Sequence, residues 1–113
     1  MHELSIAQNI VELVLENLPD NFKKVVAVNV KVGDISGVIP ESLEFCFNIL
    51  IKDTKLNGAK LNIERVSATA YCNLCNKNFQ IENLIFNCPF CFSTDTKILT
   101  GTELTISDVI LDD

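Results

Sequence analysis

Four cysteines that fall within a short segment constrain the fold of this chain more than any other feature. They form two Cys-x-x-Cys pairs, Cys72 with Cys75 and Cys88 with Cys91. Each pair can turn its two sulfurs toward one tetrahedral ion about 2.3 Å away. Four thiolates would leave no open coordination position. We therefore predict a structural metal site here, and the function has to be sought elsewhere in the sequence.

The spacing of the cysteines leaves the metal open. Zinc is the favoured ion, because the segment has too few large apolar residues to fold unaided. Iron in a rubredoxin-like site uses the same ligands, and spacing does not separate the two. A disulfide scaffold fits less well, since the chain has five cysteines, an odd number, and the first residues do not resemble a secretory signal. We expect a cytoplasmic protein, in which such pairs bind metal.

Charge argues against a nucleic-acid partner. The net charge is −6, with 15 acidic and 9 basic residues. Between Cys72 and Cys91 the only cation is Lys77, whereas zinc ribbons that bind nucleic acid commonly present a basic face to the phosphates. No apolar run approaches the roughly 18 residues that a membrane span needs. We therefore expect neither a nucleic acid nor a membrane as partner.

Hydrophobic periodicity predicts helices and strands in alternation. A period of three to four predicts a first helix over residues 1–18, ended by Pro19. A period of two predicts a strand over 26–32, with Val26, Val28, Val30 and Val32 on one face. Pro40 suits the start of a second helix that runs to about residue 52. Further strands are expected from the alternation around residues 61–63 and 104–106.

The second predicted helix is apolar around most of its circumference. Leu43, Cys46, Phe47 and Leu50 form one stripe, which Phe45, Ile49 and Ile51 widen. Such a helix either packs deeply or contacts a partner. Cys46 is in phase with the stripe, so we expect a buried, inert thiol.

These elements predict an α+β fold. The simplest arrangement is a three-stranded sheet packed against two helices, with a zinc-ribbon-like module of four cysteines inserted between the last two strands. The larger domain would then be discontinuous, comprising residues 1–70 and 99–113, and the zinc-binding module would comprise residues 71–98.

The amino terminus offers a second candidate metal site. The α-amine, the backbone nitrogen of His2 and the His2 imidazole can form two fused chelate rings, and Glu3 adds a carboxylate beside them. Planar nitrogen sets of this kind favour Ni(II) or Cu(II). Because amine and imidazole must lose protons to bind, binding should fade below about pH 6.5. The alternative is a solvated terminal histidine without a role.

Motifs along nearly the whole chain resemble those of the HypA family of nickel chaperones for [NiFe]-hydrogenase maturation. The resemblance lies in the following segments: the opening Met1-His2-Glu3-Leu4-Ser5-Ile6; the turn Gly33-Asp34-Ile35-Ser36-Gly37-Val38 with Pro40-Glu41-Ser42-Leu43; the two cysteine pairs with Pro89; and Thr100-Gly101-Thr102-Glu103-Leu104.

The resemblance implies a small metallochaperone. Transferable nickel would be held at Met1 and His2 and structural zinc by the four cysteines. Its implied partners are the GTPase HypB and the [NiFe]-hydrogenase large subunit, and some relatives serve urease. Ile39 stands where family members often have an acidic residue, and the chain has no second histidine. The fourth nickel donor is therefore Glu3, Glu41, water or a group from the partner.

A different class of protein also fits the residues. An acidic zinc-ribbon adaptor would use its apolar second helix to bind another protein and would have no nickel chemistry. We do not expect an enzyme, since the sequence has no Ser-His-Asp set and no phosphate-binding glycine loop. The sequence does not indicate the oligomeric state.

Overall fold

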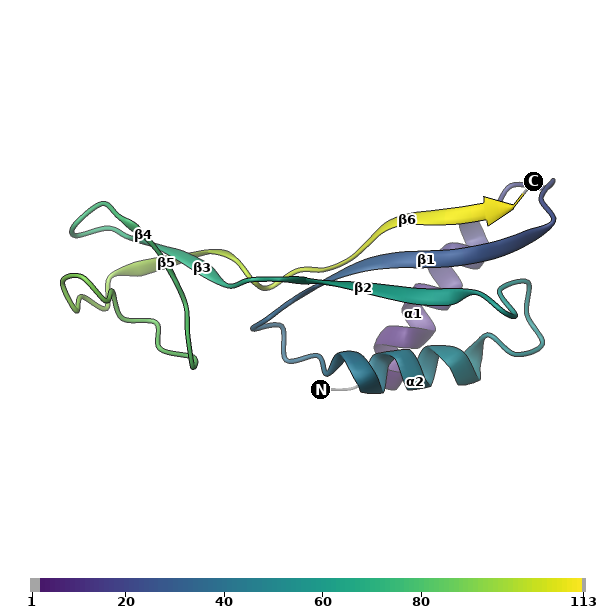
Figure 1. Cartoon of the computed structure of the whole chain (residues 1–113), viewed down its shortest axis with the longest axis horizontal. Coiled ribbons are helices and arrows are strands. Elements are labelled where there is room, and N and C mark those ends of the chain that lie inside the picture. The colour runs from purple at the N-terminus through teal and green to yellow at the C-terminus, as the bar shows by residue number, and fades with distance from the viewer. Residues whose placement is uncertain (1–2, 113) are drawn as a thin grey trace.

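Two helices and a three-stranded sheet form the larger part of the molecule (Figure 1). The structure is a computed structural model that describes residues 3–112. Strand β1 (Lys24–Gly33) lies at the centre of the sheet, parallel to β2 (Lys60–Val66) and antiparallel to β6 (Leu104–Asp112). Helices α1 (Glu3–Asn17) and α2 (Pro40–Leu50) cover one face of this sheet. The predicted α+β architecture is confirmed.

The main core lies between the two helices and β1. Phe47 and Leu43 of α2 are fully buried there, beside Ala7 of α1 and Val28 of β1. Pro40 is the first residue of α2, where its fixed φ suits a helix start and its missing N–H is not needed. The apolar periodicities of the sequence therefore correspond to the faces that the helices and β1 bury.

The predicted face of the first strand is wrong near the start of the strand. Val28, Val30 and Val32 are buried as expected, but Val26 is 41% exposed while Val25 is buried. The pairing of β1 with β6 shifts register between Val25 and Ala27. This irregularity exchanges the two faces of the strand, as a β-bulge does, and alternation along one strand does not reveal it.

Helix α2 is less buried than its composition suggests. Phe45 is 67% exposed and Ile49 is 49% exposed, so the apolar stripe extends beyond the face that packs on the sheet. Cys46 is only half-buried at the edge of the core, which corrects the expectation of a buried thiol. The helix ends at Leu50, two residues earlier than predicted.

The cysteine segment folds as a second small sheet at the far end of the molecule (Figure 1). Strand β3 (Thr69–Cys72) lies between β4 (Asn78–Gln80) and β5 (Thr96–Thr100), antiparallel to both. Its core contains only six buried residues, and two of them, Cys72 and Cys88, belong to the two cysteine pairs. The whole molecule is elongated, with extents of 55 × 24 × 17 Å.

The loop after β1 connects the two sheets. Asp34 N–H donates to Val66 O at 2.9 Å, and Ile35 N–H donates to Gly101 O at 2.9 Å. The Ile35 side chain packs against the small core of the cysteine segment. The Arg65 guanidinium contacts the Asp34 carboxylate at 3.2 Å. Within residues 3–112, no helix has both the length and the hydropathy that crossing a membrane requires.

Candidate metal centre

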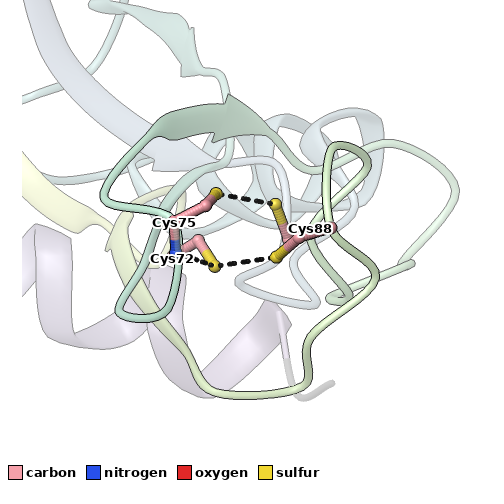
Figure 2. A group of neighbouring side chains, drawn as sticks. Cys72, Cys75 and Cys88 are labelled. Atoms are coloured by element: carbon pink, nitrogen blue, oxygen red, sulfur yellow. Dashed lines mark hydrogen bonds between the residues drawn. The ribbon is translucent and has the colours of Figure 1, made fainter.

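The four cysteines of the two pairs lie together in the small module. Their sulfur atoms all lie within 4.8 Å of one another. Cys72 Sγ lies 3.5 Å from Cys91 Sγ, and Cys75 Sγ lies 3.6 Å from Cys88 Sγ. Figure 2 shows the side chains of Cys72 and Cys75 pointing from one turn toward Cys88 on the facing loop. Cys72 and Cys88 are fully buried, so the centre is closed on its inner side.

The two turns that carry the cysteines have the same backbone design. In the first, Asn76 N–H donates to Cys72 O at 2.9 Å, and in the second, Phe92 N–H donates to Cys88 O at 2.8 Å. Asn76 and Phe92 both have positive φ, 59° and 65°. Asparagine tolerates this conformation, but for phenylalanine it costs roughly 1–2 kcal/mol. The strained Phe92 shows that closing the second turn around the cysteines outweighs a local preference.

Backbone amides also point at the sulfurs. Cys75 N–H lies 3.5 Å from Cys72 Sγ, and Phe90 N–H lies 3.4 Å from Cys88 Sγ. N–H donors stabilise a thiolate more than a thiol. The turns are therefore built to hold negatively charged sulfur, which is the form that binds metal.

The sulfur positions fit a tetrahedral ion. A tetrahedron with metal–sulfur bonds of about 2.3 Å has sulfur–sulfur edges of about 3.8 Å, close to the two distances in this centre. A disulfide would require about 2.05 Å, so the five cysteines, including Cys46, are free thiols. The geometry suits both zinc and iron, and the ligand type alone does not choose between them.

The pKa values of Cys75 and Cys88 are shifted in opposite directions. Desolvation by burial, with contributions from the sulfur contacts to Cys88, Cys72 and Cys91, raises the pKa of Cys75 to about 12. At Cys88 desolvation also acts upward, but hydrogen bonds from the backbone at Cys91 and Phe90 outweigh it and lower the pKa to about 7. Cys88 is therefore the readier of the two to become a thiolate.

The predicted nickel site lies at the edge of what the structure describes. Met1 and His2 fall outside the described residues. Glu3 is described: its Oε2 accepts a hydrogen bond from Ile39 N–H at 3.1 Å. This contact ties the start of α1 to the start of α2, where Glu41 occupies the first turn.

Sequence reasoning did not find the contact between Glu3 and Ile39. Ile39 is the N-cap of α2 and has no side chain able to cap the helix. The carboxylate that accepts its N–H comes from a residue 36 positions earlier. A capping motif is recognised from residues three or four apart, so no local signal in the sequence pointed to this pair.

The fold and the cysteine centre define a class of protein: a small α+β protein with an inserted module whose four thiols can bind one metal ion. A model of the family described as "Hydrogenase/urease nickel incorporation, metallochaperone, hypA" matches residues 1–111. Hydrogenase maturation factor HypA of Geotalea uraniireducens is 39% identical over 109 residues, which is 96% of this chain and 97% of that protein. The corresponding factor of Desulfosudis oleivorans is 41% identical over 113 residues, covering 98% of each chain.

A solved structure has the same fold. The solution structure of the Ni metallochaperone HypA from Helicobacter pylori superposes with a TM-score of 0.69 at 23% identity, covering 99% of this chain and 98% of that one. The chain belongs to the HypA family of nickel-incorporation metallochaperones. Family members are maturation factors, which agrees with the expectation that this chain is not an enzyme.

Proposed function

We propose that this chain is a nickel metallochaperone that binds Ni(II) at Met1 and His2 and delivers it during [NiFe]-hydrogenase maturation. In this proposal Cys72, Cys75, Cys88 and Cys91 hold a structural Zn(II). Residues 1–70 and 99–113 form the nickel-binding domain, and residues 71–98 form the zinc-binding module. The observation that carries the proposal is the family match over residues 1–111, which includes the amine and the imidazole of the predicted chelate.

The contact between Glu3 and Ile39 supports the proposal. It fixes the residue that follows the chelating pair against the start of α2. Holding nearby groups in one geometry lowers the entropic cost of closing a chelate. An open set of three nitrogens suits a carrier, because a closed coordination sphere would release its ion slowly. The remaining donor is Glu3, Glu41, water or a group of the acceptor protein.

Delivery requires partners in the maturation machinery. By the resemblance to the family, the expected partners are the GTPase HypB and the hydrogenase large subunit, with urease maturation proteins as further candidates. We place this work in the cytoplasm. Within residues 3–112, the four cysteines are the only group of three or more cysteine, histidine or carboxylate side chains close enough together to hold a metal ion.

A calorimetric titration with Ni(II) tests the proposal. Untagged protein should bind one equivalent, and His2→Ala should weaken binding at least tenfold, because one of three nitrogen ligands is lost. Two residues added before Met1 should have a comparable effect, since they convert the α-amine into an amide. The same two residues added after Asp113 serve as the matched control and should leave the affinity unchanged. Equal affinity in all four proteins would refute the nickel site.

Two substitutions at Glu3 separate the roles of this side chain. Glu3→Gln keeps an oxygen that can accept from Ile39 N–H, whereas Glu3→Ala removes it. If the carboxylate ligates nickel, both variants should lose affinity. If it positions the terminus, only Glu3→Ala should lose affinity, and the Ile39 amide resonance should shift only in that variant.

The protein with two residues added before Met1 also distinguishes the chaperone function from that of an adaptor. An adaptor without nickel chemistry would keep its partner binding when the amino terminus is extended, and no variant would change nickel uptake. Elemental analysis of untagged protein should find one zinc ion per chain. A coloured preparation that contains iron would instead indicate a rubredoxin-like centre.

A further inference from the structure

An apolar groove runs between α1 and β6 in the larger part of the molecule. It consists of two adjoining hollows of about 440 and 450 Å³ that share Leu13 and Ile106 in their lining. The first continues to Ile6 and Leu104, and the second to Leu111. On the helix side its lining runs from Ile6 to Asn17, which is most of α1, a helix whose 15 residues span about 22 Å.

The groove exists because β6 is only partly covered by the helices. Helix α1 buries Ala7, Val11 and Val14 in the main core, and it packs extensively against α2 as well as on the sheet (Figure 1). The inward side of β6 is left partly open, and among the described strands only β1 pairs with it. Leu13 is 51% exposed and Leu104 is 37% exposed. Large apolar side chains that line a continuous groove are typical of a binding surface.

Charge identifies the kind of occupant. Helix α1 and strand β6 contain five acidic residues and no lysine or arginine; the acidic residues are Glu3, Glu12, Glu16, Asp108 and Asp112. Glu12 and Glu16 lie one residue before and three residues after Leu13, on the exposed side of the helix. Asp108 is on the opposite face of the sheet, where it accepts a hydrogen bond from Asn29. Lys24, the first residue of β1, lies beside the far end of β6, where it pairs in register with Asp112.

We propose that this groove binds an amphipathic helix of a partner protein, about four turns long, with basic residues beside its apolar stripe. Apolar side chains at helical spacing would fill the space over Leu13 and Ile106, as in other complexes in which a helix lies in a groove. Lysine or arginine on its flank would face Glu12 and Glu16. A second copy of this chain is a poorer occupant, because its own α1 and β6 would bring like charges together. This inference is independent of nickel binding.

A model peptide tests the proposal on the full-length, zinc-loaded protein. The probe is a fluorescent, helical peptide of leucine and lysine with leucines on one face, and its partner probe has glutamate in place of every lysine. We expect the lysine peptide to bind, measured by fluorescence anisotropy, and the glutamate peptide to bind at least tenfold more weakly. Affinity for the lysine peptide should fall as salt is added, because exposed charge pairs are screened.

Variants of the protein locate the binding. Leu13→Glu should weaken binding of the lysine peptide about tenfold, although it adds a negative charge that alone would favour a basic peptide. Ile49→Glu on α2 is the matched control, since Ile49 is 49% exposed and gains the same charge; it should bind as the unchanged protein does. The double variant Glu12→Gln, Glu16→Gln replaces only exposed polar groups, so it retains the fold, and it should reduce both the affinity and its salt dependence.

Three results would overturn the proposal. The first is equal loss of binding in Leu13→Glu and Ile49→Glu together with no effect of the double glutamine variant. The second is undiminished binding of a lysine peptide with a central proline, which would indicate an extended rather than a helical occupant. The third is a dimer in sedimentation of the unchanged protein that Leu13→Glu dissociates, which would make a second copy the occupant.

Discussion

Gly33 and Gly101 lie against each other where the two sheets join. A Cβ atom on Gly33 would lie 1.9 Å from the carbonyl oxygen of Gly101, far inside van der Waals contact. The same backbone is held by a hydrogen bond from Gly33 N–H to Glu103 O at 2.7 Å. The close approach is between main chains, which do not shift as the end of a long side chain does.

Gly33→Ala should therefore lower the free energy of unfolding by about 2–3 kcal/mol, as overpacking against an immobile neighbour does. Gly58→Ala is the control. Gly58 has φ of +86° with nothing within 4 Å of an added Cβ, so the change should cost only about 1 kcal/mol of backbone strain. Urea unfolding of the zinc-loaded proteins measures both. Equal losses in the two variants would show that the junction can open to accept a methyl group.

Among the elements, the strands of the small module depend most on something other than their own sequence. Its core consists of Ala68, Ala70, Cys72, Phe79, Ile81 and Cys88. These side chains are few and mostly small, and the strands are three to five residues long. Apolar burial on this scale does not support a sheet alone. The metal is therefore expected to contribute most of the module's stability.

Removal of the metal should unfold the small module and leave the larger sheet folded. In Cys88→Ser, or after treatment with a strong chelator, amide hydrogen exchange should lose protection in β3, β4 and β5. Protection in β1 and in the buried part of α2 should persist, because their core contains no residue of the metal centre. Cys46→Ser is the control, since Cys46 lies outside the centre. Global unfolding in Cys88→Ser alone would contradict this expectation.

Metal binding at the centre should also weaken as the pH falls. The bound form requires thiolates, and the raised pKa of Cys75, about 12, means that its proton must be displaced at neutral pH. Protons therefore compete with the metal, and the apparent zinc affinity should decrease steadily from about pH 8 to about pH 6. Competition with a chelating dye measures the affinity, and buffers of different ionisation enthalpy measure the protons released. A pH-independent affinity would mean that the thiols are already ionised.

The elements differ in how well the sequence predicts them. Both helices and the parallel strands could be predicted because each buries one face against the same core, which produces a clear period. The buried face of β1 near Val26 could not be predicted. A register shift in the pairing with β6 determines which side chains are buried there, and β6 is about 80 residues away in the chain. Strands β3 to β5 showed no hydrophobic periodicity, because three to five residues are too few to establish one. The cysteine quartet was evident from spacing alone, whereas the pairing of Glu3 with Ile39 has no local signature.

At the scale of the whole molecule, charge and apolar surface are distributed unequally. In residues 71–98 two lysines, Lys77 and Lys97, balance Glu82 and Asp95, so the net charge of −6 belongs to the rest of the chain. Lys77 Nζ lies 4.9 Å from the centre of the Phe90 ring, a cation–π contact on the surface of the module. The two ends of the elongated molecule are thus chemically different.

The relative position of the two ends should depend on Ile35. Its side chain packs against the small core, and its N–H donates to Gly101 O. Ile35→Ala removes the side-chain contact and keeps the backbone bond, so the module should move more freely while both sheets stay folded. Residual dipolar couplings should then report two partly independent orientations in place of one. Ile49→Ala, at an exposed position of α2, is the control, and an unchanged single orientation in Ile35→Ala would show that hydrogen bonds alone fix the arrangement.

The interrupted path of the main sheet has a consequence for synthesis on the ribosome. Strand β6 forms one side of β1 along nearly its whole length, yet it is translated after the entire cysteine segment. Until residues 104–112 emerge, one edge of β1 has no strand beside it. The two cysteine turns are thus synthesised before this edge is covered, so on the growing chain they are free to capture a metal ion before the larger sheet closes.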